Sequence, residues 1–192
     1  MLEHTSRIAE RRDALKRVLK QIISPGSRFV WEVGCGHGHF LTAYAAAHPD
    51  EACIGIDFSS DRIARAERKR VRARIANLHF VRAGADDFLA VMPRTARFIA
   101  VFILFPDPWP KRRHSKKRVF KPEFLSAVAA AAAKGARLHF RTDHEPYFWE
   151  ASAAVRAHVD WAESDASAWS FEEPTVFQKR AKRYFSLVAT RR

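Results

Sequence analysis

Apolar and polar positions along this chain follow two periods, and segments with each period alternate along its length. Between residues 5 and 23 apolar side chains recur at helical spacing, which predicts an amphipathic helix ended by Ser24-Pro25-Gly26. Short apolar runs then predict strands, and the segments between them predict helices. The predicted strands are RFVWEVGCG, ACIGID, LHFVRAG, FIAVFILF, ARLHFRTD and YFSLVAT, and the predicted helices are HFLTAYAAA, residues 59–75, residues 122–134 and PYFWEASAAVRAHV.

This order of elements predicts an α/β fold, with a mostly parallel sheet and helices on both of its faces. Residues 98–105 form the most apolar run, which is typical of a central strand buried on both faces. The alanine run 127–133 is expected to let a helix pack close to the sheet. No internal repeat or linker interrupts the pattern, so we expect one domain over 1–192, with a helix over 1–23 and the core over 28–192.

The composition fits a globular protein, since 47% of the residues are hydrophobic and 12% are aromatic. No apolar run approaches the roughly 18 residues that span a bilayer, and the charged N-terminus lacks the apolar stretch of a signal peptide. We therefore expect a cytoplasmic protein without a membrane partner. The two cysteines, Cys35 and Cys53, fall in expected core positions, and neither a disulfide framework nor a metal cluster is expected.

The net charge of +13 changes the picture, because it points to a polyanionic partner: RNA, DNA or an anionic membrane surface. The basic residues are clustered and have aromatic residues beside them, which favours nucleic acid. Seven of the eleven residues from 111 to 121 are Lys or Arg, and two further basic clusters lie at 62–72 and 179–183. Phosphate contacts of this kind supply affinity without base specificity.

A glycine loop follows the first predicted strand in VWEVGCGHGHF, with Gly34, Gly36 and Gly38 between a strand and a helix. Glycine is needed there because the chain turns sharply and a ligand must approach the backbone. The dinucleotide fingerprint requires a further glycine at the position of His39, which disfavours NAD. S-adenosylmethionine has no pyrophosphate and remains compatible with this loop.

Two acids near the glycine loop support the same ligand. Glu32 lies at the end of the first strand, where its carboxylate can support the loop or reach a cationic group of the ligand. Asp57 ends the second strand, where a ribose-binding acid is expected. Asp86 and Asp87 follow the third strand, and either one accepts a hydrogen bond from an adenine amino group or caps the next helix.

The fourth strand leads into FPDPWP, which places Asp107 between two prolines that restrict its backbone. Strand ends of a parallel sheet meet at one edge, so Asp107 is expected near the glycine loop. Its carboxylate suits a position beside a sulfonium or a nucleobase edge. Trp109 either offers a face for base stacking or packs in the core.

Methyl transfer to a ring nitrogen with a free lone pair requires no removal of a proton, so it depends on positioning more than on a general base. This suits a sequence that offers no nucleophile–base pair. The nine histidines show no catalytic or metal-ligand spacing, and no metal is expected. Asp107 is the candidate catalytic residue.

With these motifs in order, the chain resembles the bacterial tRNA (guanine-7-)-methyltransferases over roughly residues 28–188. The resemblance implies a Rossmann-like class I methyltransferase fold with a mostly parallel seven-stranded sheet. It also implies S-adenosylmethionine as cofactor and methylation of tRNA guanine at ring nitrogen 7. The motifs that carry it are WEVGCGHGHFL, IGIDFS, FPDPWPKRRHSKKR, LHFRTDHEPY and TVFQKRAKRYFS.

The resemblance also assigns site residues. It implies that Glu32, Asp57, Gly84 and Asp107 contact the cofactor. It implies contacts with the target guanosine from Lys111, Asp143, Thr175 and Gln178. Contacts with tRNA are implied for Arg113, Lys116, Lys117 and Arg118.

The chain departs from the family pattern at several positions. Gly84 replaces the usual acid, for which Asp86 is a possible substitute, and Gln178 replaces the Glu of the Thr-x-Phe-Glu motif. KRAKRYFSLV replaces the usual Arg-Gly and Leu-Gly-His that follow this motif, and the usual arginine-rich N-terminal segment is absent or recast.

Two alternatives to guanine-N7 methylation remain open. The Asp-Pro-Trp segment is similar to the Asp-Pro-Pro-aromatic loops of methyltransferases that act on exocyclic amines, which indicates a related enzyme with another acceptor. Gly84 and Gln178 motivate the second alternative, an inactive RNA-binding protein on a methyltransferase scaffold. A monomer or weak homodimer is expected in each case.

Overall fold

The computed structural model describes residues 2–165 and 169–192 of the chain. Its centre is a seven-stranded sheet with the order β3-β2-β1-β4-β5-β7-β6. All neighbouring strands are parallel except β7, which is antiparallel to β5 and β6. The prediction of a mostly parallel sheet is therefore confirmed. The strands are β1 (Arg28–Val33), β2 (Ala52–Asp57), β3 (Leu78–Arg82), β4 (Arg97–Leu104), β5 (Ala132–Thr142), β6 (Trp161–Ser164) and β7 (Phe185–Arg191).

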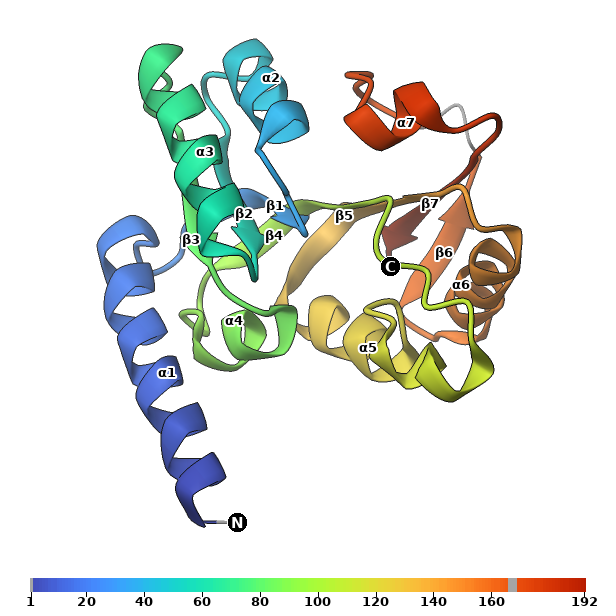
Figure 1. Ribbon diagram of the computed structural model, residues 1–192, viewed down its shortest axis with the longest axis horizontal. Helices are drawn as coiled ribbons and strands as arrows, with labels where there is room; N and C mark the ends of the chain where they lie inside the picture. Colours follow the sequence, from blue (N-terminus) through green and yellow to red (C-terminus); the bar gives the residue numbers. More distant parts are fainter. Residues whose placement is uncertain (1, 166–168) are drawn as a thin grey trace.

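Helices cover both faces of the sheet, as predicted (Figure 1). One face packs on α1 (Leu2–Ile22), α4 (Ala85–Val91), α5 (Pro122–Ala131) and α6 (Glu145–Ala157). The other packs on α2 (His39–Ala47), α3 (Ser60–Arg72) and the rings of Trp169 and Phe171. The short elements η1 (Arg112–Lys117) and α7 (Val176–Arg180) lie outside these two cores. Side chains of β1 and β4 alternate between the two cores, because successive residues of a strand point to opposite faces.

The predicted amphipathic helix at the N-terminus is confirmed as α1. Leu15 and Leu19 are buried against the sheet side of this helix, and its basic side chains face outward. The guanidinium groups of Arg11 and Arg12 both bind the carboxylate of Asp87, at 2.6 Å and 2.8 Å. Asp87 is buried in α4, so the two ion pairs fasten α1 to the helix that follows β3.

The predicted helix over 122–134 is wrong in its last three residues. The helix α5 ends at Ala131, and the second part of the alanine run begins β5, where Ala132 pairs with Phe98. Alanine favours a helix intrinsically, but pairing with a neighbouring strand overrides this preference. A register shift between Phe98 and Ala100 and a positive φ at Gly135 accommodate the early start of β5.

The C-terminal part of the chain holds two elements beyond the single strand predicted there. The four-residue β6 pairs with β7, and the side chain of Trp161 at its start is fully buried. The helix α7 follows a Thr175 cap. Both elements are too short for a clear periodic pattern, which is why the hydrophobic pattern did not predict them.

The described residues contain no disulfide, no cluster of metal ligands and no membrane-spanning helix. Cys35 and Cys53 are buried free thiols, and burial raises the pKa of Cys53 to about 12. No three described His, Cys, Asp or Glu side chains cluster closely enough to hold a metal ion. None of the helices in the described ranges combines the length and the hydropathy that a membrane crossing requires.

Candidate cofactor and substrate site

Five of the predicted site residues lie at or just after the ends of five neighbouring strands, along the carboxyl edge of the sheet. Glu32 is the penultimate residue of β1, and Asp57 is the last of β2. Gly84, Asp107 and Asp143 follow β3, β4 and β5. These five strands are parallel neighbours, and the order reverses between β1 and β4. Ligands of open parallel sheets bind at such a reversal, outside the carboxyl ends of the strands.

The glycine loop has the backbone that its sequence predicts. Gly34, Gly36 and Gly38 have φ values of 75°, 55° and 67°, in the left-handed region that favours glycine. A Cβ atom at Gly34 or Gly36 would meet nothing within 4 Å, so open space lies beside this backbone. A Cβ at Gly38 would lie 2.5 Å from the ring of Phe80, so Gly38 is required for packing as well.

Glu32 is 3% exposed, and its Oε2 atom has no hydrogen-bond partner among the described residues. Burial raises the pKa of Glu32 to about 8; a backbone hydrogen bond from Leu41 lowers this pKa and the nearby Asp57 raises it. A buried carboxyl oxygen without a partner is uncommon in folded proteins. It suits a ligand that brings a cation or a donor group to the loop.

Asp57 supports the glycine loop directly. Its two carboxyl oxygens accept hydrogen bonds from the amide of Gly36, at 3.1 Å, and from the amide of Ser59, at 2.8 Å. Arg62 approaches within 3.5 Å. The buried carboxylate therefore connects the loop after β1 to the start of α3, and each oxygen retains a lone pair for a ligand hydroxyl.

Asp86 and Asp87, the two neighbouring acids that follow β3, differ in their exposure to solvent. Asp87 is buried and holds α1, whereas Asp86 is exposed. Neither side chain caps α4, whose cap residue is Gly84. A Cβ at Gly84 would lie 2.6 Å from the ring of Phe58, which is 78% exposed. An aromatic ring therefore occupies the space beside Gly84, next to Asp57 in the sequence.

The loop that carries Asp107 is held at both of its ends. Phe105 and Trp109 have φ values of 49° and 43°, which non-glycine residues adopt only when the surroundings enforce them. The amide of Phe105 donates a 2.8 Å hydrogen bond to the carbonyl of Arg141. Arg118 donates a 2.7 Å hydrogen bond to the carbonyl of Pro108. Asp107 itself is exposed at the centre of this loop.

Trp109 belongs to the loop's own packing. The ammonium group of Lys117 lies 4.6 Å from the centre of its ring, and His114 contacts the ring edge-on at 5.8 Å. The ring is half-buried rather than fully exposed. Trp109 therefore pins the basic segment to the loop.

The basic run after Asp107 divides into two parts. Lys111, Arg113, Lys116 and Lys117 are exposed on or beside η1, as expected of groups that meet a polyanion. Arg118 differs: it is 6% exposed, pairs with Glu150, and donates to carbonyls of the Asp107 loop. The tRNA contact that the resemblance implies for Arg118 stays a prediction, and the structure adds that its buried guanidinium hydrogen bonds the loop.

A second basic surface lies on α3. A hollow of about 350 Å³ is lined by Arg65, Arg68, Lys69 and Arg72. Lys69 also donates a 3.0 Å hydrogen bond to the carbonyl of His37 in the glycine loop. The basic stripe anticipated over 62–72 thus adjoins the loop.

The residues assigned to the guanosine lie on two elements. Asp143 is exposed directly after β5. Thr175 caps α7, and its hydroxyl oxygen accepts a 3.0 Å hydrogen bond from the amide of Gln178. The side chain of Gln178 accepts a 3.1 Å hydrogen bond from Arg141 and donates one of 3.2 Å to the hydroxyl of Tyr184.

The sequence pattern did not reveal Arg141 or Glu172. Arg141 lies in β5, two residues before Asp143, and its guanidinium binds the carboxylate of Glu172. An arginine inside an apolar strand was the one available signal, since a buried guanidinium requires partners. Nothing in the sequence pattern indicates which acid supplies them.

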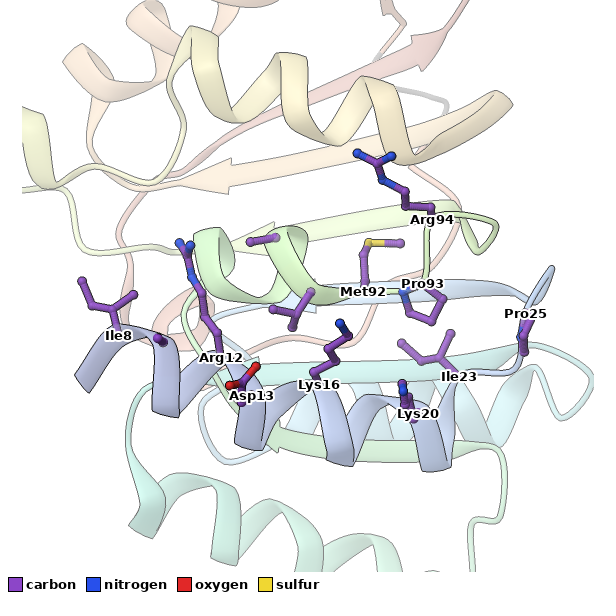
Figure 2. Close-up of a pocket in the computed structure, with 13 residues that line it drawn as sticks. Ile8, Arg12, Asp13, Lys16, Lys20, Ile23, Pro25, Met92, Pro93 and Arg94 are labelled. Carbon is purple, nitrogen blue, oxygen red and sulfur yellow. The ribbon is translucent and has the colours of Figure 1, made fainter. Parts of the chain in front are cut away.

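A separate groove of about 890 Å³ lies between α1 and the segment from α4 to β4 (Figure 2). Arg12, Lys16 and Lys20 of α1 line one side, and Met92 and Pro93 line the other. Within the described chain, this groove contains none of the predicted site residues. We therefore place the candidate site at the carboxyl edge.

The chain is similar in sequence to known methyltransferases. A family model described as a putative methyltransferase matches residues 27–188. The tRNA (guanine-N(7)-)-methyltransferase of Synechococcus sp. strain WH7803 is 31% identical over 166 residues, which cover 83% of this chain and 70% of that protein. The enzyme of the same name from Nocardia farcinica is 38% identical over 128 residues, covering 67% of this chain and 47% of that protein. This chain thus spans about half the length of the Nocardia relative.

Solved structures agree on the fold. TrmN from Thermus thermophilus has a TM-score of 0.62 at 15% identity, covering 93% of this chain and 48% of that one. The precorrin-6y C5,15-methyltransferase of Geobacter metallireducens gives 0.60 at 12% identity, covering 95% and 88%. A putative methyltransferase from Streptococcus mutans, solved in complex with SAH, gives 0.59 at 10% identity, covering 94% and 97%. These likenesses confirm the Rossmann-like class I methyltransferase fold.

The sequence resemblance is confirmed on two grounds. The family model covers most of the chain, and the Synechococcus relative is matched over more than two thirds of its own length. The chain belongs to the tRNA (guanine-N(7)-)-methyltransferase family.

Proposed function

We propose that the protein is an S-adenosylmethionine-dependent methyltransferase that acts on tRNA and methylates guanine at ring nitrogen 7. The observation that carries the proposal is the meeting of Glu32, Asp57, Gly84, Asp107 and Asp143 at the edge where the strand order reverses. Membership of the family supplies the reaction class. Among the described residues, exposed basic side chains of the Asp107 loop and of α3 adjoin this edge.

The residues present fit the cofactor. The partnerless Oε2 of Glu32 suits the amino group of its methionyl part, and Asp57 suits the two ribose hydroxyls. The exposed ring of Phe58 lies beside Gly84, so we assign the adenine to this face, with the exposed Asp86 as the candidate acceptor for its amino group. When bound, the cofactor supplies an activated methyl group.

The protein's own contribution is to place the acceptor. Ring nitrogen 7 of guanine carries a lone pair and no proton, so the residues need only hold the base in line. Asp107 is the candidate catalytic residue because its pinned loop follows β4, beside the strand reversal. Asp143, Thr175 and Gln178 are the candidate contacts to the base edge.

The tRNA would be held by phosphate contacts outside the site. Lys111, Arg113, Lys116 and Lys117 are exposed directly behind Asp107, on the same loop. Such contacts fix the register of the RNA without reading its sequence. The oligomeric state stays a prediction of monomer or weak homodimer.

The test is incubation with unmodified tRNA and labelled cofactor, followed by identification of the product nucleoside. We expect 7-methylguanosine. A methylated exocyclic amine would instead favour the related enzyme with another acceptor. Absence of both a methylated product and binding of S-adenosylhomocysteine would favour an inactive RNA-binding scaffold, whereas binding that is lost in Asp57→Ala would argue against it.

A further inference from the structure

Residues 169–184, here called the C-terminal segment, cross the face of the sheet that carries α2. Figure 1 shows α7, which belongs to this segment, on the same side of the sheet as α2 and α3. The ring of Phe171 packs edge-on against Phe40 and Tyr44, with ring centres 5.8 Å and 5.2 Å apart. The ring of Phe177 faces Phe105, at the start of the Asp107 loop, at 6.5 Å. The segment therefore borders both the glycine-loop helix and the Asp107 loop.

Arg141 joins this segment to the sheet. Its side chain is 5% exposed, and its guanidinium donates two hydrogen bonds to the Glu172 carboxylate, at 2.9 Å and 2.6 Å. It donates further bonds to Gln178, at 3.1 Å, and to Ser186, at 2.9 Å. The guanidinium also lies 3.8 Å from the ring centre of Trp169. Three points of the segment thus converge on one buried cation.

The Arg141 guanidinium has one charged partner and one neutral partner in the C-terminal segment: the carboxylate of Glu172 and the amide of Gln178. Glu172 balances the guanidinium, and its pKa is lowered chiefly by the hydrogen bond from Arg141. Gln178 accepts a hydrogen bond from Arg141 through its side-chain oxygen and donates one to the hydroxyl of Tyr184 through its side-chain nitrogen. An amide can accept from the cation and donate to a second group at once, whereas a carboxylate only accepts. A second carboxylate at 178 would face Glu172 with one cation between them.

The two partners of the ion pair differ in burial. Glu172 is 54% exposed and can return to water, whereas Arg141 remains beneath the segment. Loss of the charge at 172 would leave a buried guanidinium with neutral acceptors only, which is an unfavourable state. Lifting the segment would rehydrate the guanidinium, so the pair's charge favours the closed arrangement.

We propose that Arg141 and Glu172 are positioning residues whose ion pair, together with the hydrogen bond from Arg141 to Gln178, holds the C-terminal segment in place for the substrate base. Thr175 and Gln178, which our proposed function assigns to that base, lie within the segment. The inference rests on the proposed function only for the identity of the substrate. The attachment of the segment to the sheet is a property of the protein alone.

The first experiment measures amide hydrogen exchange of the free protein in four forms. These are wild type, Glu172→Gln, Gln178→Glu, and the double variant that exchanges the two side chains. We expect protection of residues 169–184 to fall about tenfold in each single variant, since hydrogen bonds to a charged group are stronger than neutral ones. The double variant restores one carboxylate and one amide around Arg141, so protection should recover.

Glu163→Gln is the matched control, because it removes the acid of a different Arg–Glu pair, with Arg156, between β6 and α6. It should leave the C-terminal segment unchanged. Core amides of β1 and β4 report whether any variant has lost its fold. Unchanged exchange at 169–184 in Glu172→Gln, or a double variant no better than the single ones, would overturn the proposal.

The second experiment measures methyl transfer in the same four forms. We expect the KM for tRNA to rise about tenfold in Glu172→Gln while the Kd for S-adenosylhomocysteine stays within twofold, because the segment is assigned to the base and not to the cofactor. The double variant should recover. Looser exchange with an unchanged KM for tRNA would overturn the positioning role. A wild-type protein that methylates no tRNA would instead refute the proposed function, and exchange alone would then decide the attachment.

Discussion

Glu32 is a carboxyl group that the fold buries at the end of β1 without a partner for one of its oxygens. Its neighbour Asp57 is buried as well, but two backbone amides satisfy it. The two acids therefore differ in their hydrogen-bond partners. Asp57 is part of the scaffold of the glycine loop, whereas one oxygen of Glu32 has no partner among the described residues and is available to a ligand.

The raised pKa of Glu32 predicts pH-dependent cofactor binding. With a pKa of about 8, Glu32 is protonated at pH 6 in the free protein, and pairing with an ammonium group requires it to lose that proton. Affinity for S-adenosylhomocysteine should therefore rise with pH between about 5.5 and 7, by at most about tenfold per pH unit for one proton. Calorimetry in buffers of different ionisation enthalpy measures the released proton.

The raised pKa of Glu32 makes the stability of the free protein depend on pH in the opposite direction from cofactor affinity. The folded state retains a proton that the unfolded chain loses above pH 4.5, so the contribution of Glu32 to stability falls as pH rises from 4.5 toward 8. Glu32→Gln should remove both dependences. A variant that still releases a full proton on binding would contradict the role of Glu32.

Asp107→Ala tests the candidate catalytic residue. The side chain is exposed on a loop held by other groups, so the substitution should leave the fold intact. We expect kcat/KM for tRNA methylation to fall about 10²-fold or more, because misplacement of reacting groups is costly. Asp50→Ala removes an exposed acid elsewhere and should have near-normal turnover. Near-normal turnover in Asp107→Ala as well would refute the assignment.

At the scale of elements, the segment from Phe105 to Arg118 combines two expected functions: it holds Asp107 in a fixed backbone, and it presents basic side chains to RNA. Two left-handed residues and the buried Arg118 hold its backbone, while the side chains of Arg113, Lys116 and Lys117 are exposed. Proline rings around Asp107 limit the remaining freedom. The loop is therefore rigid where chemistry is expected and exposed where RNA is expected.

Arg118→Leu separates these two functions. It removes the hydrogen bonds to Pro108 and Trp109 and leaves Glu150 without its partner. We expect the free energy of unfolding to fall by about 2 kcal/mol, discounted for the exposure of Glu150. Arg113→Leu, at an exposed position five residues earlier in the chain, should change the free energy of unfolding by less than about 0.5 kcal/mol. Urea denaturation compares the two, and equal stabilities would contradict the structural role of Arg118.

At the scale of the molecule, the chain has a net charge of +13, and part of its basic side chains lie on elements that adjoin the carboxyl edge. Exposed cations follow Asp107, a basic hollow lies on α3, and α7 ends in Lys179 and Arg180. The field of such an arrangement attracts a polyanion toward the site. Affinity for tRNA should therefore depend steeply on salt.

The triple variant Arg113→Ala, Lys116→Ala, Lys117→Ala tests this salt dependence. Each lost phosphate contact lowers the slope of log K against log salt by about 0.7 to 0.9, so the three together should lower it by about 2. Affinity for S-adenosylhomocysteine should stay unchanged, because these groups lie outside the cofactor residues. Filter binding over a salt series measures the slope, and an unchanged slope would exclude these residues from the RNA interface.

The arrangement of the strand ends could be predicted from the sequence, because buried parallel strands leave continuous apolar runs and their ends converge at one edge. Glu32, Asp57 and Asp107 were found in this way. The pairing of Arg141 with Glu172 could not be predicted, since it joins residues 31 positions apart through a segment without periodicity. The burial of Arg118 could not be predicted because its neighbours in the sequence share its charge, and only the fold distinguishes the buried member.

The strand order also sets the sequence of events during synthesis of the chain. The strand β7 lies between β5 and β6, yet it is made after both, and β6 has no other partner in the described sheet. Until β7 leaves the ribosome, β5 presents an open edge and β6 remains unpaired. Open edges of this kind promote aggregation of nascent chains. Truncations before residue 185 should consequently accumulate as insoluble protein, however well the glycine loop and its acids have already formed.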